Sequence, residues 1–124
     1  MRRAKSVPTE QELEILKIVW RLKTATVREV YEALLERRRI AYTTVMTMMN
    51  ILERKGHLRK RREAKAFVYA ATRPQRQVIG KMVREFVDRV FNGSARPLLV
   101  HLVEDRKLSD DDLRELRRAL EEAE

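Results

Sequence analysis

The chain has 124 residues, of which 44% are hydrophobic, and a formal net charge of +9. This length fits one ordinary domain or two small ones, and the hydrophobic content is sufficient for a folded core. The chain contains no cysteine, which excludes disulfides, thiolate zinc sites and cysteine nucleophiles. No apolar run approaches the roughly 20 residues that span a bilayer, and the N-terminal sequence lacks a secretion signal, so we expect a cytoplasmic protein that does not bind membranes.

The charge is unevenly distributed along the chain. Residues 1–73 contain 18 Lys and Arg against 8 Asp and Glu, whereas residues 74–124 contain 10 against 11. This segregation favours a polyanion-binding first domain, 1–73, and a second domain, 74–124, with another role. We expect the first residues, with Arg2, Arg3 and Lys5, to form a mobile arm.

Three short helices are predicted in the first domain. Thr9 and Thr26 each precede a Glu by three residues, which is the spacing of a capping box, and apolar residues follow at helical intervals. A third helix is predicted from near Thr43 to Gly56, a residue suited to the left-handed conformation that ends helices.

A basic hairpin is predicted next. Residues 57–62 and 67–71 read as extended stretches joined by residues 63–66, and Phe67, Val68 and Tyr69 favour a strand. Three helices followed by such a hairpin are typical of a winged helix-turn-helix. The predicted fold class is therefore mainly α, with a winged helix-turn-helix domain, a short β-hairpin wing and a C-terminal helical dimerisation domain.

The third helix has two faces at a helical advance of about 100° per residue. The apolar face, which we expect to pack on the domain, consists of Val45, Met48, Met49 and Leu52. The polar face consists of Thr43, Thr47, Asn50 and Arg54, with Met46 beside them. Small hydroxyl and amide groups suit base edges, and hydroxyls can equally hold a phosphate. The hairpin supplies the cations Arg59, Lys60, Arg61, Arg62 and Lys65, which strand alternation directs to both sides, so that some of them face the DNA backbone and others face solvent.

Three amphipathic helices are predicted after Pro74: residues 75–91, a segment near 97–104, and a last helix that Ser109 and Asp112 cap. Their apolar residues exceed what about fifty residues can bury alone. We therefore expect a homodimer, and the alternative is that these helices fold back on the first domain. The predicted dimerisation residues are Ile79, Met82, Val83, Phe86, Val90, Leu98, Leu102, Leu113, Leu116 and Leu120.

The sequence contains no recognisable catalytic constellation. His57 and His101 are the only histidines, and there is no Ser-His-Asp set, HExxH motif or glycine-rich phosphate loop. We predict that the protein is not an enzyme and that it needs no metal and no cofactor.

These pieces together resemble the penicillinase repressor and methicillin-resistance repressor family of winged-helix transcription regulators. The similar segments run from Thr9 to Glu122 and include ELEILKIVW, TVREVYEAL, AYTTVMTMMNILERKG and FVYAAT, followed by FNGS and LLVHLVEDRKLSDDDLRELRRALEE. The resemblance implies a homodimeric repressor that binds a palindromic double-stranded DNA operator. It places DNA contacts at Tyr42, Thr43, Thr44 and Thr47, with support from wing cations such as Arg62 and Lys65.

The resemblance also implies a route of derepression. In the family, a sensor of β-lactam antibiotics triggers proteolysis within the C-terminal helices, at an Asn-Phe bond in the better-known members. The corresponding pair in this chain is His101 and Leu102, which makes it the candidate cleavage site. A sensor-linked protease is therefore an expected partner. The cysteine cluster of the copper-responsive branch is absent.

A second function is compatible with the same residues. A winged helix can act as a protein-interaction module or as an architectural module that binds DNA without sequence preference through its basic face. Equal affinity for an operator-like palindrome and for scrambled DNA would favour this alternative.

Overall fold

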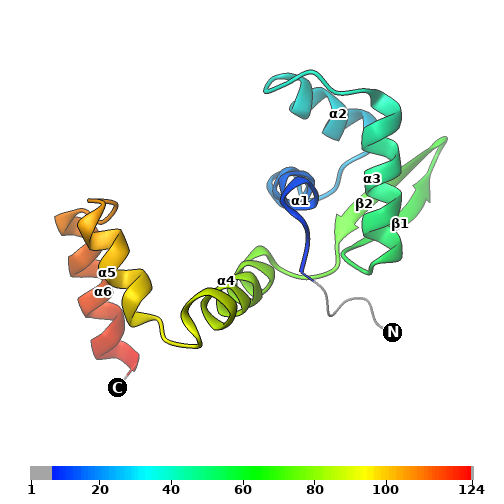
Figure 1. Ribbon diagram of the computed structural model, residues 1–124. Helices are drawn as coiled ribbons and strands as arrows, with labels where there is room; N and C mark the ends of the chain where they lie inside the picture. Colours follow the sequence, from blue (N-terminus) through cyan, green and yellow to red (C-terminus); the bar gives the residue numbers. More distant parts are fainter. Residues whose placement is uncertain (1–6, 124) are drawn as a thin grey trace. The chain divides into compact units, whose positions relative to one another are not determined.

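The computed structural model describes residues 7–123. This part of the chain contains six helices and one antiparallel two-stranded sheet (Figure 1): α1 Glu10–Leu22, α2 Val27–Leu35, α3 Tyr42–Arg54, β1 Leu58–Glu63, β2 Ala66–Ala71, α4 Gln75–Phe91, α5 Arg96–Glu104 and α6 Asp110–Ala123. The predicted mainly α fold with a hairpin wing is confirmed. The predicted mobile arm, with Arg2, Arg3 and Lys5, lies outside the described residues.

Both predicted capping boxes of the first domain are present. At the start of α1, Thr9 Oγ1 accepts a hydrogen bond from the backbone N–H of Glu12 (3.2 Å), and Glu12 Oε1 accepts one from the backbone N–H of Thr9 (3.0 Å). Thr26 and Glu29 form the same pair of bonds at the start of α2, at 3.1 and 2.8 Å. These bonds give partners to N–H groups that a first helical turn leaves unsatisfied.

The third helix starts one residue earlier than predicted, at Tyr42. Ala41 is its N-cap residue and makes no side-chain capping bond. Gly56 has a φ of 88°, in the left-handed region. The chain therefore turns after α3 at the glycine that the sequence predicted to end this helix.

The hairpin has a tighter connection than predicted. β1 and β2 pair from Leu58 opposite Ala71 to Glu63 opposite Ala66, which leaves only residues 64 and 65 in the turn. Ala64 has a φ of 52°, in the left-handed region that Gly, Asn and Asp adopt most readily. The pairing of the strands therefore holds an alanine where sequence rules expect another residue.

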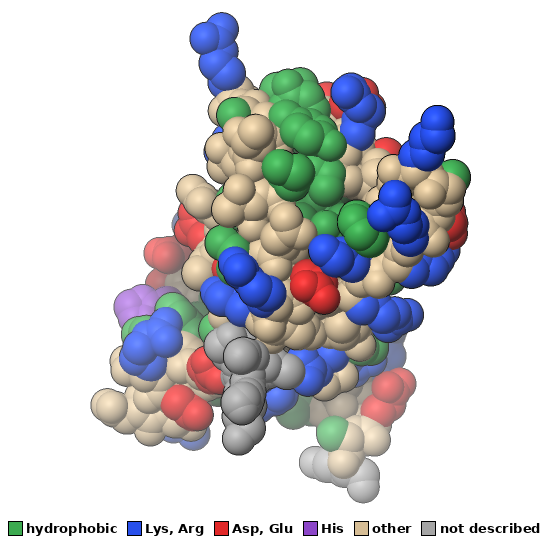
Figure 2. Space-filling view, turned by 90° about the vertical axis from the view of Figure 1, so that its right-hand side faces the viewer, with side chains coloured by type: hydrophobic (Ala, Val, Ile, Leu, Met, Phe, Trp, Pro, Cys, Tyr) green, Lys and Arg blue, Asp and Glu red, His purple; other side chains and the backbone are tan. Residues whose placement is uncertain are grey.

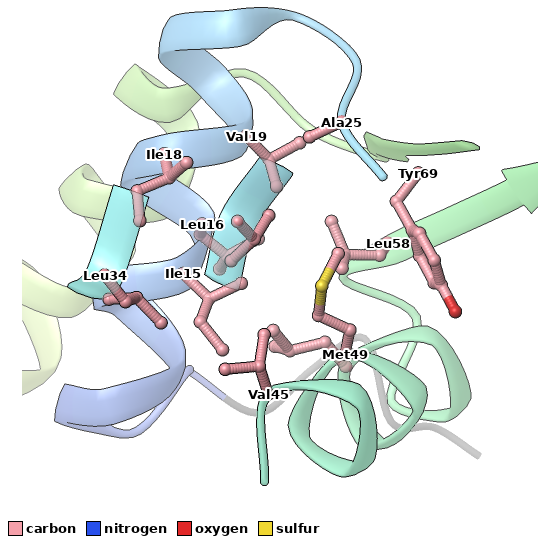
Figure 3. Packing of buried hydrophobic residues seen from close by; sticks show 12 residues of the cluster. Ile15, Leu16, Ile18, Val19, Ala25, Leu34, Val45, Met49, Leu58 and Tyr69 are labelled. Carbon is pink, nitrogen blue, oxygen red and sulfur yellow. The ribbon is translucent and has the colours of Figure 1, made fainter. Parts of the chain in front are cut away.

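The apolar residues of α1, α2, α3 and the hairpin form one buried cluster (Figure 3), made of Ile15, Leu16, Ile18, Val19, Ala25, Val30, Leu34, Val45, Met49, Leu52, Leu58 and Tyr69. The segment between α1 and α2 joins the sheet by a backbone pair that the sequence did not predict. Ala25 N–H donates to Tyr69 O (2.9 Å), and Tyr69 N–H donates to Ala25 O (2.8 Å). This pair attaches the hairpin to the helical layer of its own unit.

The chain divides into two compact units, one that ends at Lys81 and one that begins at Met82. The division falls inside α4, whereas the predicted domain boundary lies before Pro74, where the hairpin has ended. The assignment of separate roles to residues 1–73 and 74–124 stays a prediction.

The unit that begins at Met82 has little buried apolar surface. Val87 is buried, and no residue of α5 or α6 among the described residues is. Phe91 makes ring contacts within this unit, with centroid distances of 5.9 Å to Phe86 and 6.1 Å to His101. The predicted capping pair of α6 is present, with Ser109 and Asp112 joined by bonds of 2.9 and 3.0 Å.

Candidate nucleic-acid interface

The outer face of α3 is polar and exposed. Thr43, Thr44 and Thr47 are exposed, whereas the inner face is held by buried Val45, Met49 and Leu52, with Met48 half-buried beside them. The predicted division of this helix into a packing face and an uncovered face is confirmed. The three hydroxyls are thus carried by a helix whose position the core fixes.

Tyr42 is held at the first turn of α3 by two neighbours. Its ring meets that of Tyr31 edge to face at a centroid distance of 5.4 Å, and the guanidinium of Arg28 lies 6.0 Å from its centroid. The Tyr42 side chain remains 38% exposed. Such ring contacts reduce side-chain freedom, so that Tyr42 presents a defined surface next to the threonines.

The register of the hairpin divides the wing cations between two faces. Lys60 and Arg62 lie opposite Tyr69 and Phe67, on the face where Leu58 packs into the core. Both cations lie over the ring of Phe67, with distances to its centroid of 4.6 Å for Lys60 and 5.5 Å for Arg62. This face is turned toward the layer that contains α3, because its buried residues pack there.

The other face of the hairpin has less net positive charge, because it also contains Glu63. Arg61 lies on that face, and its guanidinium pairs with Glu63 at 2.5 Å. Because strand side chains alternate, Arg59 shares the face with Arg61. The sequence supplied five wing cations without distinguishing them, and the strand register separates Lys60 and Arg62 from the other two strand residues.

A groove of about 560 Å³ lies between the start of α2, α3 and the hairpin. Its lining residues are Thr26, Val27, Arg28, Tyr42, Met46, Asn50, Lys60, Lys65, Ala66, Phe67 and Tyr69. Among these described residues there are three cations and no carboxylate. On the side that carries α3 and the hairpin, Lys and Arg side chains project around a strip of hydrophobic side chains (Figure 2). The cations of this surface suit a polyanion, and the hydrophobic strip suits apolar groups of the same ligand.

Asn50 is the most constrained of the predicted contact residues. It is half-buried, and its Oδ1 accepts a hydrogen bond from the hydroxyl of Tyr69 at 3.0 Å. Burial, followed by the nearby Glu53 and Tyr42, raises the pKa of Tyr69 above its usual value, so the hydroxyl keeps its proton. Asn50 is therefore oriented by the core.

The structure brings some of the predicted site residues together and places others apart. Tyr42, Asn50 and Lys65 line the groove. Those outside its lining are Thr43, Thr44, Thr47 and Arg54, which are exposed on α3, and Arg62, which is exposed on β1. Sequence reasoning counted Lys60 among the wing cations without singling it out, and it did not include Arg28 or Phe67 in the site. Strand alternation would have selected Lys60 and Phe67 once the register was known.

Other classes of site have little support in the described part of the chain. Residues 7–123 contain no group of three or more His, Asp or Glu side chains placed to hold a metal ion. No helix within the same range combines the length and the apolar character required to cross a bilayer.

Three helices, a hairpin wing and an uncovered polar face on the third helix define a winged helix-turn-helix protein. The sequence profile of the family described as penicillinase repressor matches residues 8–122, and the chain belongs to this family. The family is one of repressors rather than enzymes. The resemblance stated from the sequence motifs is therefore confirmed.

Curated relatives match over most of their length. The transcriptional regulator BlaI of Mycobacterium tuberculosis is 37% identical over 115 residues, covering 91% of this chain and 82% of the relative. The penicillinase repressor of Bacillus licheniformis is 28% identical over 120 residues, covering 95% and 94%. The methicillin resistance regulatory protein MecI of Mammaliicoccus sciuri is 28% identical over 109 residues, covering 88% and 89%.

Two solved structures are similar to the winged-helix part. The DNA-binding domain of the repressor BlaI superposes with a TM-score of 0.53 at 27% identity, over 60% of this chain and 90% of that one. The monomeric form of Bacillus licheniformis BlaI, in complex with the blaP half-operator, gives a TM-score of 0.51 at 26% identity, over 61% and 92%.

Proposed function

We propose that this chain is a transcriptional repressor that binds a palindromic operator as a homodimer, with α3 in the major groove and the hairpin on the backbone. The proposal rests chiefly on the uncovered polar face of α3 beside a groove whose described lining contains cations and no carboxylate. Threonines can contact a thymine methyl group or donate a hydrogen bond to a base edge, and cations neutralise phosphates. The complex of monomeric Bacillus licheniformis BlaI with a half-operator supports binding to operator DNA.

The contacts that we propose are Tyr42, Thr43, Thr44, Thr47, Asn50 and Arg54 on α3, with Arg62 and Lys65 from the wing. The test begins with selection of bound sequences from random DNA, followed by footprinting on the selected site. We expect protection of a two-fold symmetric sequence, because two linked half-site readers impose their symmetry on the operator. The double variant Thr43→Ala/Thr47→Ala should lose this protection. Ser94→Ala, which removes an exposed hydroxyl from the second unit, should keep it.

A single result would favour the alternative function. If the wild-type chain binds the selected palindrome and scrambled DNA with equal affinity at moderate salt, the basic face acts without sequence preference. The chain would then be an architectural module, and the proposal of a repressor would be wrong.

We propose that residues 74–124 are the dimerisation domain and residues 1–73 the DNA-binding domain. The predicted dimerisation residues Val83, Phe86, Val90, Leu113, Leu116 and Leu120 are large, apolar and exposed, and Ile79, Met82, Leu98 and Leu102 are half-buried. Exposed apolar residues at helical spacing favour association with a second copy. Sizing in solution at micromolar concentration tests this, and a monomer there would contradict it.

Derepression by proteolysis at the bond between His101 and Leu102 is part of the proposal. Both residues lie in α5, with His101 exposed and Leu102 half-buried. A helix with no buried residue among those described opens locally at low free energy, which a protease needs for access to an extended strand. Cells challenged with a β-lactam or another envelope stress should accumulate a fragment that ends at His101. An intact chain under full induction would contradict this route.

A further inference from the structure

Tyr69 connects the core of the first unit to the DNA-facing side of α3. Its side chain is only 2% exposed and belongs to the buried cluster. In Figure 3 its oxygen points away from the aliphatic side chains of that cluster. The hydroxyl donates to Asn50 Oδ1 at 3.0 Å, and both residues line the groove beside α3.

The position of Tyr69 is fixed at its backbone as well as at its ring. The two hydrogen bonds with Ala25, at 2.9 and 2.8 Å, hold the Tyr69 backbone to the segment before α2. Ala25 is itself completely buried. The hydroxyl thus reaches Asn50 from a side chain that cannot move without disturbing the core, which makes the Asn50 orientation a property of the fold.

The bond from Tyr69 decides which atoms Asn50 offers to a ligand. A side-chain amide has one acceptor oxygen and two N–H donors on Nδ2. Since Oδ1 already accepts the hydroxyl proton, the two Nδ2 donors are the groups that Asn50 offers most readily to a ligand in the groove. In the major groove, guanine presents the acceptors N7 and O6, whereas adenine presents N7 with a donor at N6. Adenine would have to share Oδ1 with Tyr69, so guanine matches the fixed amide better.

We propose that Tyr69 is a positioning residue that holds the Asn50 amide so that Nδ2 donates to the edge of a guanine in each operator half-site. This inference rests on the proposed function and adds to it the identity of one base and the residue that selects it. Tyr69 does not touch the base. It acts by favouring the amide orientation in which Oδ1 accepts the hydroxyl proton, so that pairing with adenine would require Oδ1 to accept a second hydrogen bond.

The experiment uses the full-length chain and the operator selected from random DNA. Each guanine is replaced in turn by adenine and by 7-deazaguanine, which lacks the N7 acceptor. For the wild-type chain we expect one position per half-site where guanine is favoured over adenine by about tenfold. Tyr69→Phe, which removes only the hydroxyl, should reduce this ratio to about twofold or less. In an Asn50→Ala background, Tyr69→Phe should have no further effect on the ratio.

A matched control separates positioning from loss of stability. Thr72 Oγ1 donates to Gly56 O at 2.6 Å, so Thr72→Val also removes a hydroxyl hydrogen bond from the same unit. This variant should lower the melting temperature but leave the guanine-to-adenine ratio unchanged. The ratio compares two DNA sequences with one protein, so reduced folding cancels from it.

Three outcomes would overturn the inference. If the Tyr69→Phe variant keeps the wild-type guanine-to-adenine ratio at every position, the hydroxyl does not orient the Asn50 amide. Equal weakening of all DNA sequences by Asn50→Ala would mean that Asn50 contacts a phosphate rather than a base. A preference for adenine at the position that Asn50→Ala affects would mean that Oδ1 is the reading atom. Failure of the proposed function is distinct from these, because the wild-type chain would then select no sequence.

Discussion

Leu52 in α3 is fully buried, whereas Leu120 in α6 exposes 69% of its surface. The same contrast holds between the unit that ends at Lys81, which encloses a continuous apolar cluster, and the unit that begins at Met82, in which α5 and α6 bury none of their described residues. Apolar surface left in water on this scale usually belongs to an interface. The first unit therefore has an apolar core of its own, and the exposed apolar residues of the second are the surface through which we propose dimerisation.

The largest effect should come from a charge on the exposed apolar face of the second unit. We expect Leu116→Glu to disrupt the dimer and to reduce operator affinity about 100-fold or more, because a dimer gains avidity that a monomer lacks. Sizing and operator titration measure the two consequences. Glu115→Gln, on the same helix, serves as a control and should change neither. If the Leu116→Glu chain remains dimeric with full affinity, the apolar face of α6 has another role.

The next effect concerns the core of the first unit. Leu52→Ala should lower the free energy of unfolding by about 2 to 5 kcal/mol, because truncation of a buried leucine loses apolar burial and leaves a cavity. Chemical denaturation, followed at the only tryptophan, Trp20, measures it. The matched change Leu113→Ala in α6 should have an effect that depends on protein concentration. A comparable loss for both variants at every concentration would remove the distinction between the units.

A smaller effect is expected from a partly buried ion pair that belongs to the first unit. Glu12 is buried, and its Oε2 lies 2.8 Å from Lys55 Nζ. Burial tends to raise the pKa of Glu12, but the hydrogen bonds from Lys55 and from the Thr9 backbone, together with the charge of Lys55, hold the pKa below the usual 4.5. The ionised carboxylate therefore stabilises the fold above the unfolded-state pKa, and this stability is lost as the pH falls through the lower folded-state value.

Glu12→Gln tests this assignment. The variant should lose about 1 to 3 kcal/mol at neutral pH, since a charged hydrogen bond is removed. Its stability should also fall less steeply than that of the wild type below pH 4.5. Glu10→Gln, at an exposed position of the same helix, should show the wild-type decrease of stability at acid pH. If the stability of Glu12→Gln falls as steeply with decreasing pH as that of the wild type, the role of this carboxylate is contradicted.

The smallest effect separates the two faces of the hairpin. Lys60→Ala should reduce the slope of log affinity against log salt concentration by about 0.9, the contribution of one phosphate contact. Arg61→Ala should reduce it by less, because Arg61 lies on the other face and pairs with Glu63. Titrations of operator binding at several salt concentrations measure both slopes. Equal slopes for the two variants would mean that DNA does not distinguish the faces.

Sequence patterns predicted the features that depend on neighbouring residues. The capping boxes at Thr9 and Thr26 and the packing face of α3 follow from spacing within a single helix, and the structure contains them. The family resemblance came from the order of such segments. Local spacing was thus sufficient for the winged-helix fold and for the two faces of α3.

Features that depend on distant backbone partners could not be predicted in the same way. The pair between Ala25 and Tyr69 joins residues far apart in the sequence, and a backbone hydrogen bond leaves no side-chain signature. The position of Lys60 in the groove required the strand register, which the turn at Ala64 did not reveal, because alanine is uncommon at a φ of 52°. Asn50 was predicted to be on the polar face, but its bond to Tyr69 needed the tertiary structure.

The pair between Ala25 and Tyr69 has a consequence for the kinetics of DNA encounter. Swinging the hairpin away from the helices would break two backbone hydrogen bonds, each contributing about 1 kcal/mol. At most a few per cent of molecules would then have a displaced wing at any moment, because Leu58 and Tyr69 would also lose their burial in the core. In the proposed complex, DNA would therefore meet a wing that is already in place, and binding would not lose affinity to the ordering of the hairpin. Changes in operator affinity should consequently appear mainly in the dissociation rate.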